Sequence, residues 1–433
     1  MTITAERPRR RTLASHVRAH PWRTLGAVLM VPPLAVTGFL AYTGLYRVPT
    51  SLPAGRDAAI TEVMDGAELP GAAVATLRDG RMASMRGFGQ ADPATGRRVT
   101  PDTLFTVGSV SKTVTATALM TLYEKGALGL DDDVDRHLPF AVRNPAFPDV
   151  PITVRMLLQH TSGIRDGDAY GRSYTLTTTP VAPDSPVALG TFLRDYLVPG
   201  GRLYSEQSFA GTAPGTHYEY SNVGFGLVGL LVEAVSGRPF PEYCRTAVFE
   251  PLGMTRSAWR HADVDLSTMA VPYGYDDLRR RPARIGFYGY PTYPDGALKT
   301  SVAEYTRFLS VFVNDGRTPE GAVFLEPGTV AEMLRLTSPP GVTDDGDSAI
   351  GLAWHVSGST YTHDGLDPGV ISFVAFDPSN RRAAVLFATG ADYDDPVTGT
   401  VRQVLADPAA GVRLVAAAVG LEAVVQREVT PSG

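Results

Sequence analysis

Apolar and polar positions predict β-strands near both ends of the folded part of the chain. Apolar stretches at 72–77 and 82–88 flank an Asp79-Gly80 turn, which indicates a hairpin. Four further strands are predicted, at 349–355, 360–363, 370–376 and 383–389. A turn at 377–380 joins the last two, so a meander of short antiparallel strands fits best.

Between these strands the period of apolar residues changes to that of a helix. Apolar residues recur on one stripe from Ser109 to Lys125, which predicts a helix there, and Gly126 follows as its C-cap. The middle of the chain mixes helical stretches with Pro- and Gly-rich loops, including 165–215, of which 175–186 is expected as an exposed excursion. We therefore expect an α+β protein, in which an antiparallel sheet is flanked by helices and joined by a helical lobe.

The N-terminus is predicted to be a membrane anchor. Six arginines between residues 7 and 23 precede the uncharged run 24–46, which as a helix would measure roughly 34 Å and could cross the ~30 Å hydrocarbon core. The positive-inside rule then leaves 1–23 in the cytoplasm and the bulk of the chain outside. A cleaved secretory signal is the alternative, and Arg10-Arg11 also suggests a twin-arginine export signal. All three place the folded part beyond the membrane.

The remaining boundaries follow from the same patterns. We expect a tether at 47–58, a folded domain at 59–425 and a tail at 426–433. Within the domain we expect a sheet lobe from about 59–112 and 345–425 and a helical lobe from about 113–344. The stretch 401–425 is expected as one or two helices that cover one face of the sheet, because it is too charged for a second membrane span.

Composition excludes several classes of function. A net charge of −6, with both signs interspersed after the N-terminus, argues against a nucleic-acid partner, which would meet a basic face. The single cysteine, Cys244, excludes an internal disulfide and every multi-cysteine metal site. The sequence also lacks a nucleophile elbow, a zinc-protease helix motif and a phosphate-binding loop. We therefore expect no metal or organic cofactor, and the oligomeric state stays open.

Ser109 and Lys112 are the first candidate catalytic pair. Lysine occurs only at 112, 125 and 299, so its position carries information. The spacing of three puts hydroxyl and amine on one face at a helix start, with Cβ atoms ~5 to 6 Å apart. A lysine whose pKa is lowered by burial can act as a base for serine, and the helix N-terminus would stabilise an oxyanion. Because this motif also arises by chance, it needs a second feature.

Tyr220 and Asn222 supply this second feature. They lie just before an apolar helix expected over 223–235. The tyrosine could relay a proton to a leaving group, and the asparagine could bind a substrate amide or carbonyl. The alternatives are a tyrosine packed under a loop and an asparagine N-cap.

A third feature is His363-Asp364-Gly365, at the end of a predicted strand. Alternation puts His363 and Gly365 on one face of the strand and Asp364 on the other. Gly365 would admit a substrate backbone, and the N–H of Leu366 could be a second oxyanion donor. His363 is either an electrophilic or proton-carrying neighbour or an ordinary strand-end histidine.

Together these motifs resemble the serine beta-lactamase-related superfamily, which includes class C beta-lactamases, D,D-carboxypeptidases, D-aminopeptidases and esterase relatives. The matching phrases are FTVGSVSK at 105–112, LLQHTSG at 157–163, PG at 214–215 leading to YEYSN at 218–222, PLGM at 251–254 and HDG at 363–365. The resemblance covers roughly 55–405.

The resemblance implies a beta-lactamase/transpeptidase-like fold with the site in a cleft. It also implies that Ser109 is acylated, that Lys112 is its base partner and that Tyr220 shuttles the proton. Asn222 would position substrate, and the N–H groups of Ser109 and Leu366 would form the oxyanion hole. His160, in the second phrase, is implied to shape the structure and not to act in catalysis.

One departure from the family pattern bears on the substrate. Where beta-lactamases and D,D-peptidases carry Lys-Thr-Gly, this chain has His363-Asp364-Gly365, which lacks the fixed positive charge that receives a substrate carboxylate. We therefore expect an extracytoplasmic serine hydrolase that acts through an acyl-enzyme on a less acidic ester or amide, or on a peptide recognised at its amino end. A D,D-carboxypeptidase or beta-lactamase acting on cell-wall-derived or antibiotic substrates, and a non-hydrolytic penicillin-binding-like sensor, are the alternatives.

Overall fold

The computed structural model describes residues 56–66, 69–176, 184–276, 281–337, 349–357 and 359–390. The predicted basic segment, the anchor, nearly all of the tether, the helices at 401–425 and the tail lie outside these residues. Within the described part no single helix is long and apolar enough to cross a membrane, although the stretches 222–236 and 240–252, bent by 77°, pass that test as a pair.

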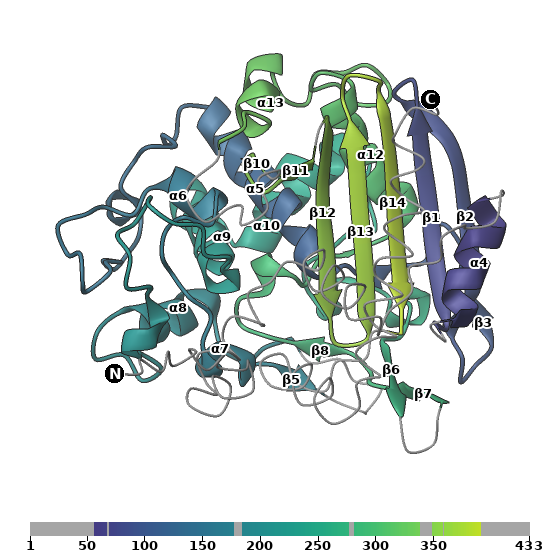
Figure 1. Ribbon diagram of the computed structural model, residues 1–433, viewed down its shortest axis with the longest axis horizontal. Coiled ribbons are helices and arrows are strands. Elements are labelled where there is room, and N and C mark those ends of the chain that lie inside the picture. The colour runs from purple at the N-terminus through teal and green to yellow at the C-terminus, as the bar shows by residue number, and fades with distance from the viewer. Residues whose placement is uncertain are drawn as a thin grey trace, which may run out of the picture. The chain divides into compact units, whose positions relative to one another are not determined.

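Eight of the described strands form one antiparallel sheet, in the order β10-β11-β12-β13-β14-β1-β2-β3 (Figure 1). Their bounds are β1 (Gly71–Arg78), β2 (Arg81–Asp92), β3 (Arg97–Arg98), β10 (Ala349–Ile350), β11 (His355–Ser357), β12 (Thr360–Asp367), β13 (Val370–Asp377) and β14 (Arg382–Thr389). The predicted hairpin is confirmed as β1 and β2, with Asp79 and Gly80 both at positive φ in its turn. Strand β1 pairs with β14, so the two ends of the domain sequence meet inside the sheet.

Strand β12 corrects one sequence prediction. The strand was expected to end at His363, but it continues to Asp367 and turns into β13 through Pro368-Gly369. The predicted strand end is therefore wrong, because Gly365, the half-buried Leu366 and Asp367 continue the pairing with β13. The alternation itself is confirmed, since His363 and Gly365 are buried while Asp364 is half-buried.

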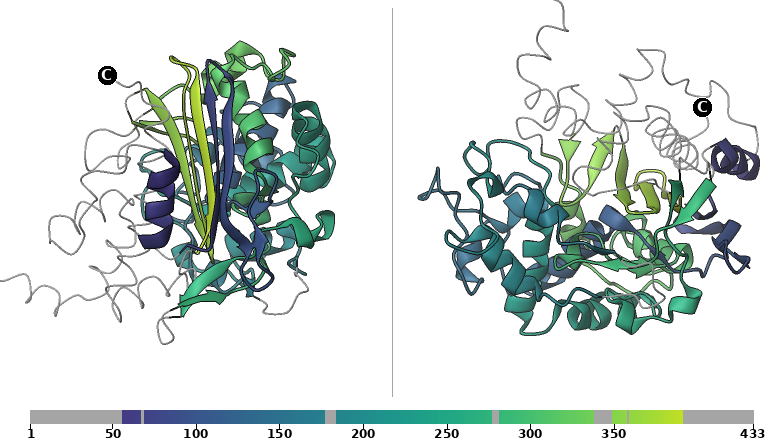
Figure 2. Two further views of the ribbon diagram at one scale, coloured as in Figure 1. Left: turned by 90° about the vertical axis from the view of Figure 1, so that its right-hand side faces the viewer. Right: turned by 90° about the horizontal axis from the view of Figure 1, so that it is seen from below.

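The helices cover both faces of the sheet, as the edge-on view in Figure 2 shows. They are α4 (Arg56–Gly66), α5 (Ser111–Glu124), α6 (Val154–Leu158), α7 (Asp168–Gly171), α8 (Leu189–Leu197), α9 (Asn222–Ser236), α10 (Phe240–Cys244), α11 (Glu250–Leu252), α12 (Val302–Val313) and α13 (Pro327–Met333). Short two-stranded pairs join β4 (Phe105–Thr106) to β9 (Lys299–Thr300), β5 (Thr175–Leu176) to β8 (Tyr288–Gly289), and β6 (Tyr273–Asp276) to β7 (Arg281–Arg284).

Helix α4, the purple helix of Figure 1, was not predicted from the sequence and lies on one face of the sheet. Its Ile60 and Met64 pack against Val74, Phe373 and Leu386. The helix includes residues 56–58, which the sequence assigned to the tether. Apolar burial against the sheet therefore orders this segment, although its sequence has little helical amphipathicity of its own.

The opposite face carries the main core and the helical lobe. Helix α12 packs on β1 and β14, so it belongs with the sheet although it falls in the range 113–344 that was expected as the helical lobe. Helix α5 is buried from Ser111 to Leu122 and packs against α9. The helix predicted after Tyr220 is confirmed as α9, and Gly126 ends α5 at a φ of 68°. Helix α5 is thus buried along most of its length, and the residues just before it, 108–110, lie against β12 and β13.

We predict that Ile60→Ala lowers the free energy of unfolding by about 2 to 4 kcal/mol, because it leaves a cavity between α4 and the sheet. Urea denaturation of the full chain measures this. The control is Thr61→Ala, an exposed position on the same helix, which should stay within about 0.5 kcal/mol of the parent. Equal stability of both variants would mean that α4 contributes nothing to the cooperative unit.

Candidate active site

Ser109 and Lys112 lie at the junction of a 3₁₀ turn and α5. The turn, η1 (Gly108–Val110), presents Ser109, and the first turn of α5 brings Lys112 to it. Lys112 Nζ lies 2.9 Å from Ser109 Oγ, 2.6 Å from Asn222 Oδ1 and 2.8 Å from the carbonyl oxygen of Asp295. The pair predicted from the sequence is thus within hydrogen-bonding distance, and three segments of the chain hold the amine.

The protonation of Lys112 is set chiefly by burial. The side chain is fully buried, which lowers the pKa of Lys112 from 10.5, while the carboxyl groups of Asp295 and Asp166 act in the opposite direction. The two carbonyl oxygens accept two N–H groups, so the remaining direction around nitrogen faces Ser109 Oγ. In the neutral amine that direction is the lone pair, which is the geometry that a base for Ser109 requires.

Tyr220 lies beside the side chain of Ser109, whose hydroxyl acts to lower the pKa of the phenol. Burial raises the pKa of Tyr220 well above 10, so its hydroxyl is a neutral phenol. Behind it lies His160, whose ring centroid is 4.3 Å from that of Tyr220 and whose Nδ1 accepts the N–H of Ser221 at 3.1 Å. Burial lowers the pKa of His160 well below 6.5. A neutral imidazole therefore supports the tyrosine, which fits the structural role implied for it.

Asn222 is the first residue of α9, and Ser221 is its N-cap, accepting the N–H of Gly224 at 2.9 Å. The asparagine amide instead spans Lys112 and Asp166, donating from Nδ2 to the Asp166 carboxylate at 2.8 Å. Asp166 also accepts the backbone N–H groups of Asn222 and Val223, each at 2.9 Å. Sequence analysis missed Asp166, because nothing in its spacing connects it to the start of a helix 56 residues later.

Two glycines bring the nucleophile against β12. A Cβ on Gly365 would lie 2.5 Å from the carbonyl oxygen of Val107 and 3.0 Å from the nitrogen of Ser109. A Cβ on Gly108, whose φ is 50°, would lie 3.3 Å from the nitrogen of Leu366. Only glycine permits so close an approach at Gly365, and the approach brings the backbone nitrogens of Ser109 and Leu366 to one place.

The pairing register orients the N–H of Leu366. Asp367 and Val370 flank the two-residue turn, so they form the hydrogen-bonded pair nearest to it. Leu366, opposite Ile371, is then in a non-hydrogen-bonded pair, and its N–H points away from β13 toward η1. This is the orientation that the predicted oxyanion hole requires.

His363 is buried within β12, and its Nδ1 lies 2.6 Å from the carbonyl oxygen of Asp364. Burial lowers the pKa of His363 well below 6.5, so it is neutral. Among the described residues no hydrogen bond joins it to Ser109, Lys112 or Tyr220. Its catalytic or binding role stays a prediction, and the site has no fixed positive charge at this position.

Buried acids and tyrosines next to Lys112 were also missed by sequence analysis. Tyr174 donates to Asp367 at 3.0 Å, and Tyr170 donates to Asp295 at 3.4 Å. Burial raises the pKa of Asp367 to about 7 and that of Asp295 well above 3.8. These residues are far apart in sequence and carry no motif, so only the fold shows that they adjoin the lysine.

A family model described as beta-lactamase matches residues 56–407. The chain belongs to the beta-lactamase family. It is 29% identical over 367 residues to penicillin-binding protein 4 of Amycolatopsis lactamdurans, a match that covers 80% of this chain and 87% of the relative. It is 25% identical to protein flp of Staphylococcus aureus over 60% of this chain, but spans only about half (48%) of that protein's length.

Among solved structures, a class C beta-lactamase from Rhodobacter sphaeroides superposes with a TM-score of 0.59 at 21% identity. The superposition covers 85% of this chain and 98% of that one. The resemblance stated from the sequence motifs is therefore confirmed, as are the α+β fold and its antiparallel sheet. No group of three or more potential metal ligands occurs in the part of the chain that the structure describes.

We predict that ester hydrolysis increases with pH through the pKa of Lys112, because only the neutral amine can accept the proton of Ser109. The midpoint should lie below 10.5, the ordinary lysine value, since burial lowers it. Initial rates measured from pH 5 to 10 give this profile.

The matched variants are Lys112→Arg and Lys125→Arg. Arginine keeps the charge but does not deprotonate, so the first variant should lose about 10²- to 10⁴-fold in kcat/KM. The second replaces an exposed lysine at the end of α5 and should change nothing. Retained activity in Lys112→Arg would exclude the lysine as base.

Proposed function

We propose that this protein is a serine hydrolase that forms an acyl-enzyme on Ser109. The observation that carries the proposal is that Ser109 Oγ lies 2.9 Å from a buried amine and beside a neutral phenol, where the backbone nitrogens of Ser109 and Leu366 also come close together. Each partner supplies one requirement of acyl transfer, namely a base, an acid and oxyanion stabilisation.

The reaction follows from these positions. Neutral Lys112 takes the proton of Ser109 as Oγ attacks the substrate carbonyl carbon, and the N–H groups of Ser109 and Leu366 stabilise the resulting oxyanion. Tyr220 then donates its proton to the leaving alcohol or amine and is reprotonated from Lys112. A water molecule then gives a proton to Lys112 as it attacks the acyl carbon. The bond from that carbon to Ser109 Oγ breaks, Oγ takes the proton back from Lys112, and the acid is released.

We propose that the substrate is an ester or amide without a carboxylate beside the scissile bond. Support comes from the neutral His363 and from the carboxyl groups around Lys112, which include Asp295 and Asp367. A substrate carboxylate in this desolvated region would lack the fixed cation of a Lys-Thr-Gly motif and would lie near Asp367, whose pKa of about 7 leaves it partly ionised at neutral pH. The same charges suit a peptide substrate recognised at its amino end, which keeps that class open.

We further propose an extracytoplasmic location, with a single membrane span at 24–46 and the N-terminus in the cytoplasm. The support is the uncharged run preceded by six arginines. The substrate would then be a small molecule or peptide met outside the membrane, where cell-wall fragments are one source.

We predict that the full chain hydrolyses a short-chain p-nitrophenyl ester and that Ser109→Ala abolishes this activity. A burst of p-nitrophenol equal to the enzyme concentration would show the acyl-enzyme directly. The control is Ser267→Ala, an exposed serine on a surface turn, which should retain full activity. Equal rates in the parent and the Ser109 variant would refute the assigned nucleophile.

We also predict that a cephalosporin is turned over at least about 100-fold more slowly than the ester, because its carboxylate finds no fixed cation. Measuring both substrates on the same preparation tests this. Rapid cephalosporin hydrolysis would favour the beta-lactamase alternative. A stable adduct on Ser109 without product release would favour a sensor.

A further inference from the structure

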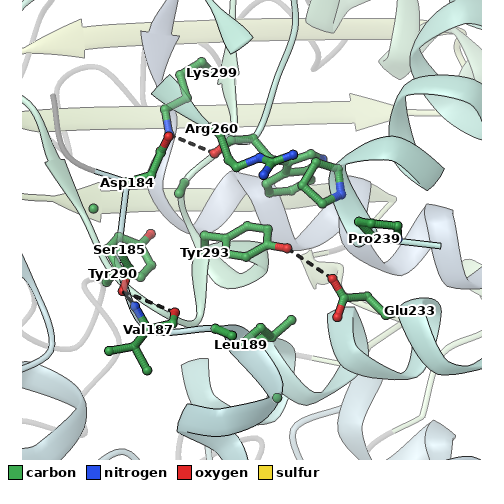
Figure 3. A pocket seen from close by; sticks show the side chains of 16 residues that line it. Asp184, Ser185, Val187, Leu189, Glu233, Pro239, Arg260, Tyr290, Tyr293 and Lys299 are labelled. Atoms are coloured by element: carbon green, nitrogen blue, oxygen red, sulfur yellow. Dashed lines mark hydrogen bonds between the residues drawn. The ribbon is translucent and has the colours of Figure 1, made fainter. Parts of the chain in front are cut away.

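A second cavity, of about 260 Å³, lies among the start of α8, the end of α9, the turn η7 (Tyr293–Asp295) and β9. None of Ser109, Lys112, Tyr220 and Asn222 lines it. Its walls are largely apolar and aromatic, formed by Val187, Leu189, Pro239, Pro241, Trp259, Tyr290, Tyr293 and Ala297. In the view of Figure 3, Lys299 and Glu233 lie at opposite ends with the Tyr293 ring between them.

Lys299 is the unusual group in this cavity. Its side chain is 1% exposed, and its Nζ donates one hydrogen bond, to the carbonyl oxygen of Trp259 at 2.9 Å. The other two N–H groups have no acceptor among the residues that the structure describes. Burial lowers the pKa of Lys299 to about 8, against the opposing effect of the carboxyl groups of Asp184, Asp367 and Asp263, so the amine is still mostly charged at neutral pH. A buried ammonium with unused donors is costly unless an acceptor reaches it.

The acidic groups of the walls are already satisfied by donors of the protein. Asp184 accepts the N–H groups of His261 at 2.8 Å and Ala262 at 3.1 Å. Glu233 accepts the N–H of Phe240 at 2.9 Å and the hydroxyl of Tyr293 at 3.4 Å.

Arg260, the other cation of the lining, faces Asp263 at 3.3 Å, so it too has a partner. Among the charged groups of the lining, Lys299 is therefore the one that still needs a hydrogen-bond acceptor, and it lies among apolar walls.

We propose that this cavity is a second ligand site, which binds a small monocarboxylate with an aromatic or branched aliphatic body. The carboxylate would accept from Lys299, and the body would lie against Tyr293, Trp259 and Leu189. The volume of about 260 Å³ is just below the range of about 300 to 1,000 Å³ for small-molecule pockets, which limits the ligand to a small acid. Charge-assisted hydrogen bonds in a desolvated site favour the acid over a neutral analogue.

The site is separate from the catalytic serine but adjoins the elements that hold it. Tyr293 begins the turn whose last residue, Asp295, accepts from Lys112. Lys299 pairs with Thr106, shortly before the nucleophile. Tyr290, whose ring stacks on Tyr174, contributes both to the cavity wall and to the hydroxyls around Asp367.

The test is calorimetric titration of the full chain with acetate, 3-methylbutanoate and phenylacetate, each compared with its amide. At least one of the two larger acids should bind at least about tenfold more tightly than its amide. That preference should disappear in Lys299→Met, and the affinity of the acid should fall as the pH rises through about 8, where the ammonium is lost. Equal binding of acid and amide, or no binding by any acid, would overturn the proposal.

A second pair of variants guards against misfolding of the lysine variant. Val187→Trp places a large side chain at the rim of the cavity from a position that is 42% exposed, so it should abolish acid binding and leave the fold intact. Val323→Trp, at an exposed position outside the lining, should bind the acid like the parent. Binding that survives Val187→Trp would place the ligand elsewhere and contradict the proposed site. Because the readout is binding, failure here is distinct from failure of the proposed hydrolysis.

Discussion

The burial of Lys112 is the constraint on which the catalytic centre depends. An amine removed from water needs hydrogen-bond partners, and here they come from Ser109, from Asn222 at the start of α9 and from the backbone of Asp295. The same removal from water lowers the pKa of Lys112. Burial therefore explains both why the amine is hydrogen-bonded on all sides and why it suits the proposed role of a base. The site can act as a base only because the fold has excluded water from the lysine.

The carbonyl oxygen of Asp295 reaches Lys112 only because α5, α9 and the turn η7 lie close together. Glycines on α9 permit this, since a Cβ at Gly229 would lie 2.4 Å from the ring of Pro294 and one at Gly226 would lie 3.0 Å from Thr292. The turn η7 therefore packs directly on the helix backbone, and its last carbonyl reaches Lys112. Helix α9 thus holds the lysine twice, once through Asn222 and once through the turn that its glycines admit.

The sequence predicted what depends on local pattern and on short motifs. The β1 and β2 hairpin, the α9 helix and the Ser109 and Lys112 pair were all visible, because turn residues, apolar runs and a spacing of three residues are local signals. Helix α4 was not visible, since its order comes from the sheet beneath Ile60. Asp166 and Asp367 were not visible either, because only tertiary contacts bring them to the lysine. The carbonyl of Asp295 leaves no signal in the sequence, because every residue has a backbone carbonyl.

The contact between Gly108 and Gly365 has a consequence for the timing of activity. One of the two proposed oxyanion donors, Ser109, belongs to the first part of the domain and the other, Leu366, to a strand near its end, and they meet only when β12 lies against η1. A nascent or proteolysed chain lacking β12 would have the serine and the lysine but no paired donors. In the proposed mechanism, Ser109 should therefore be readily acylated only after β12 has joined the sheet.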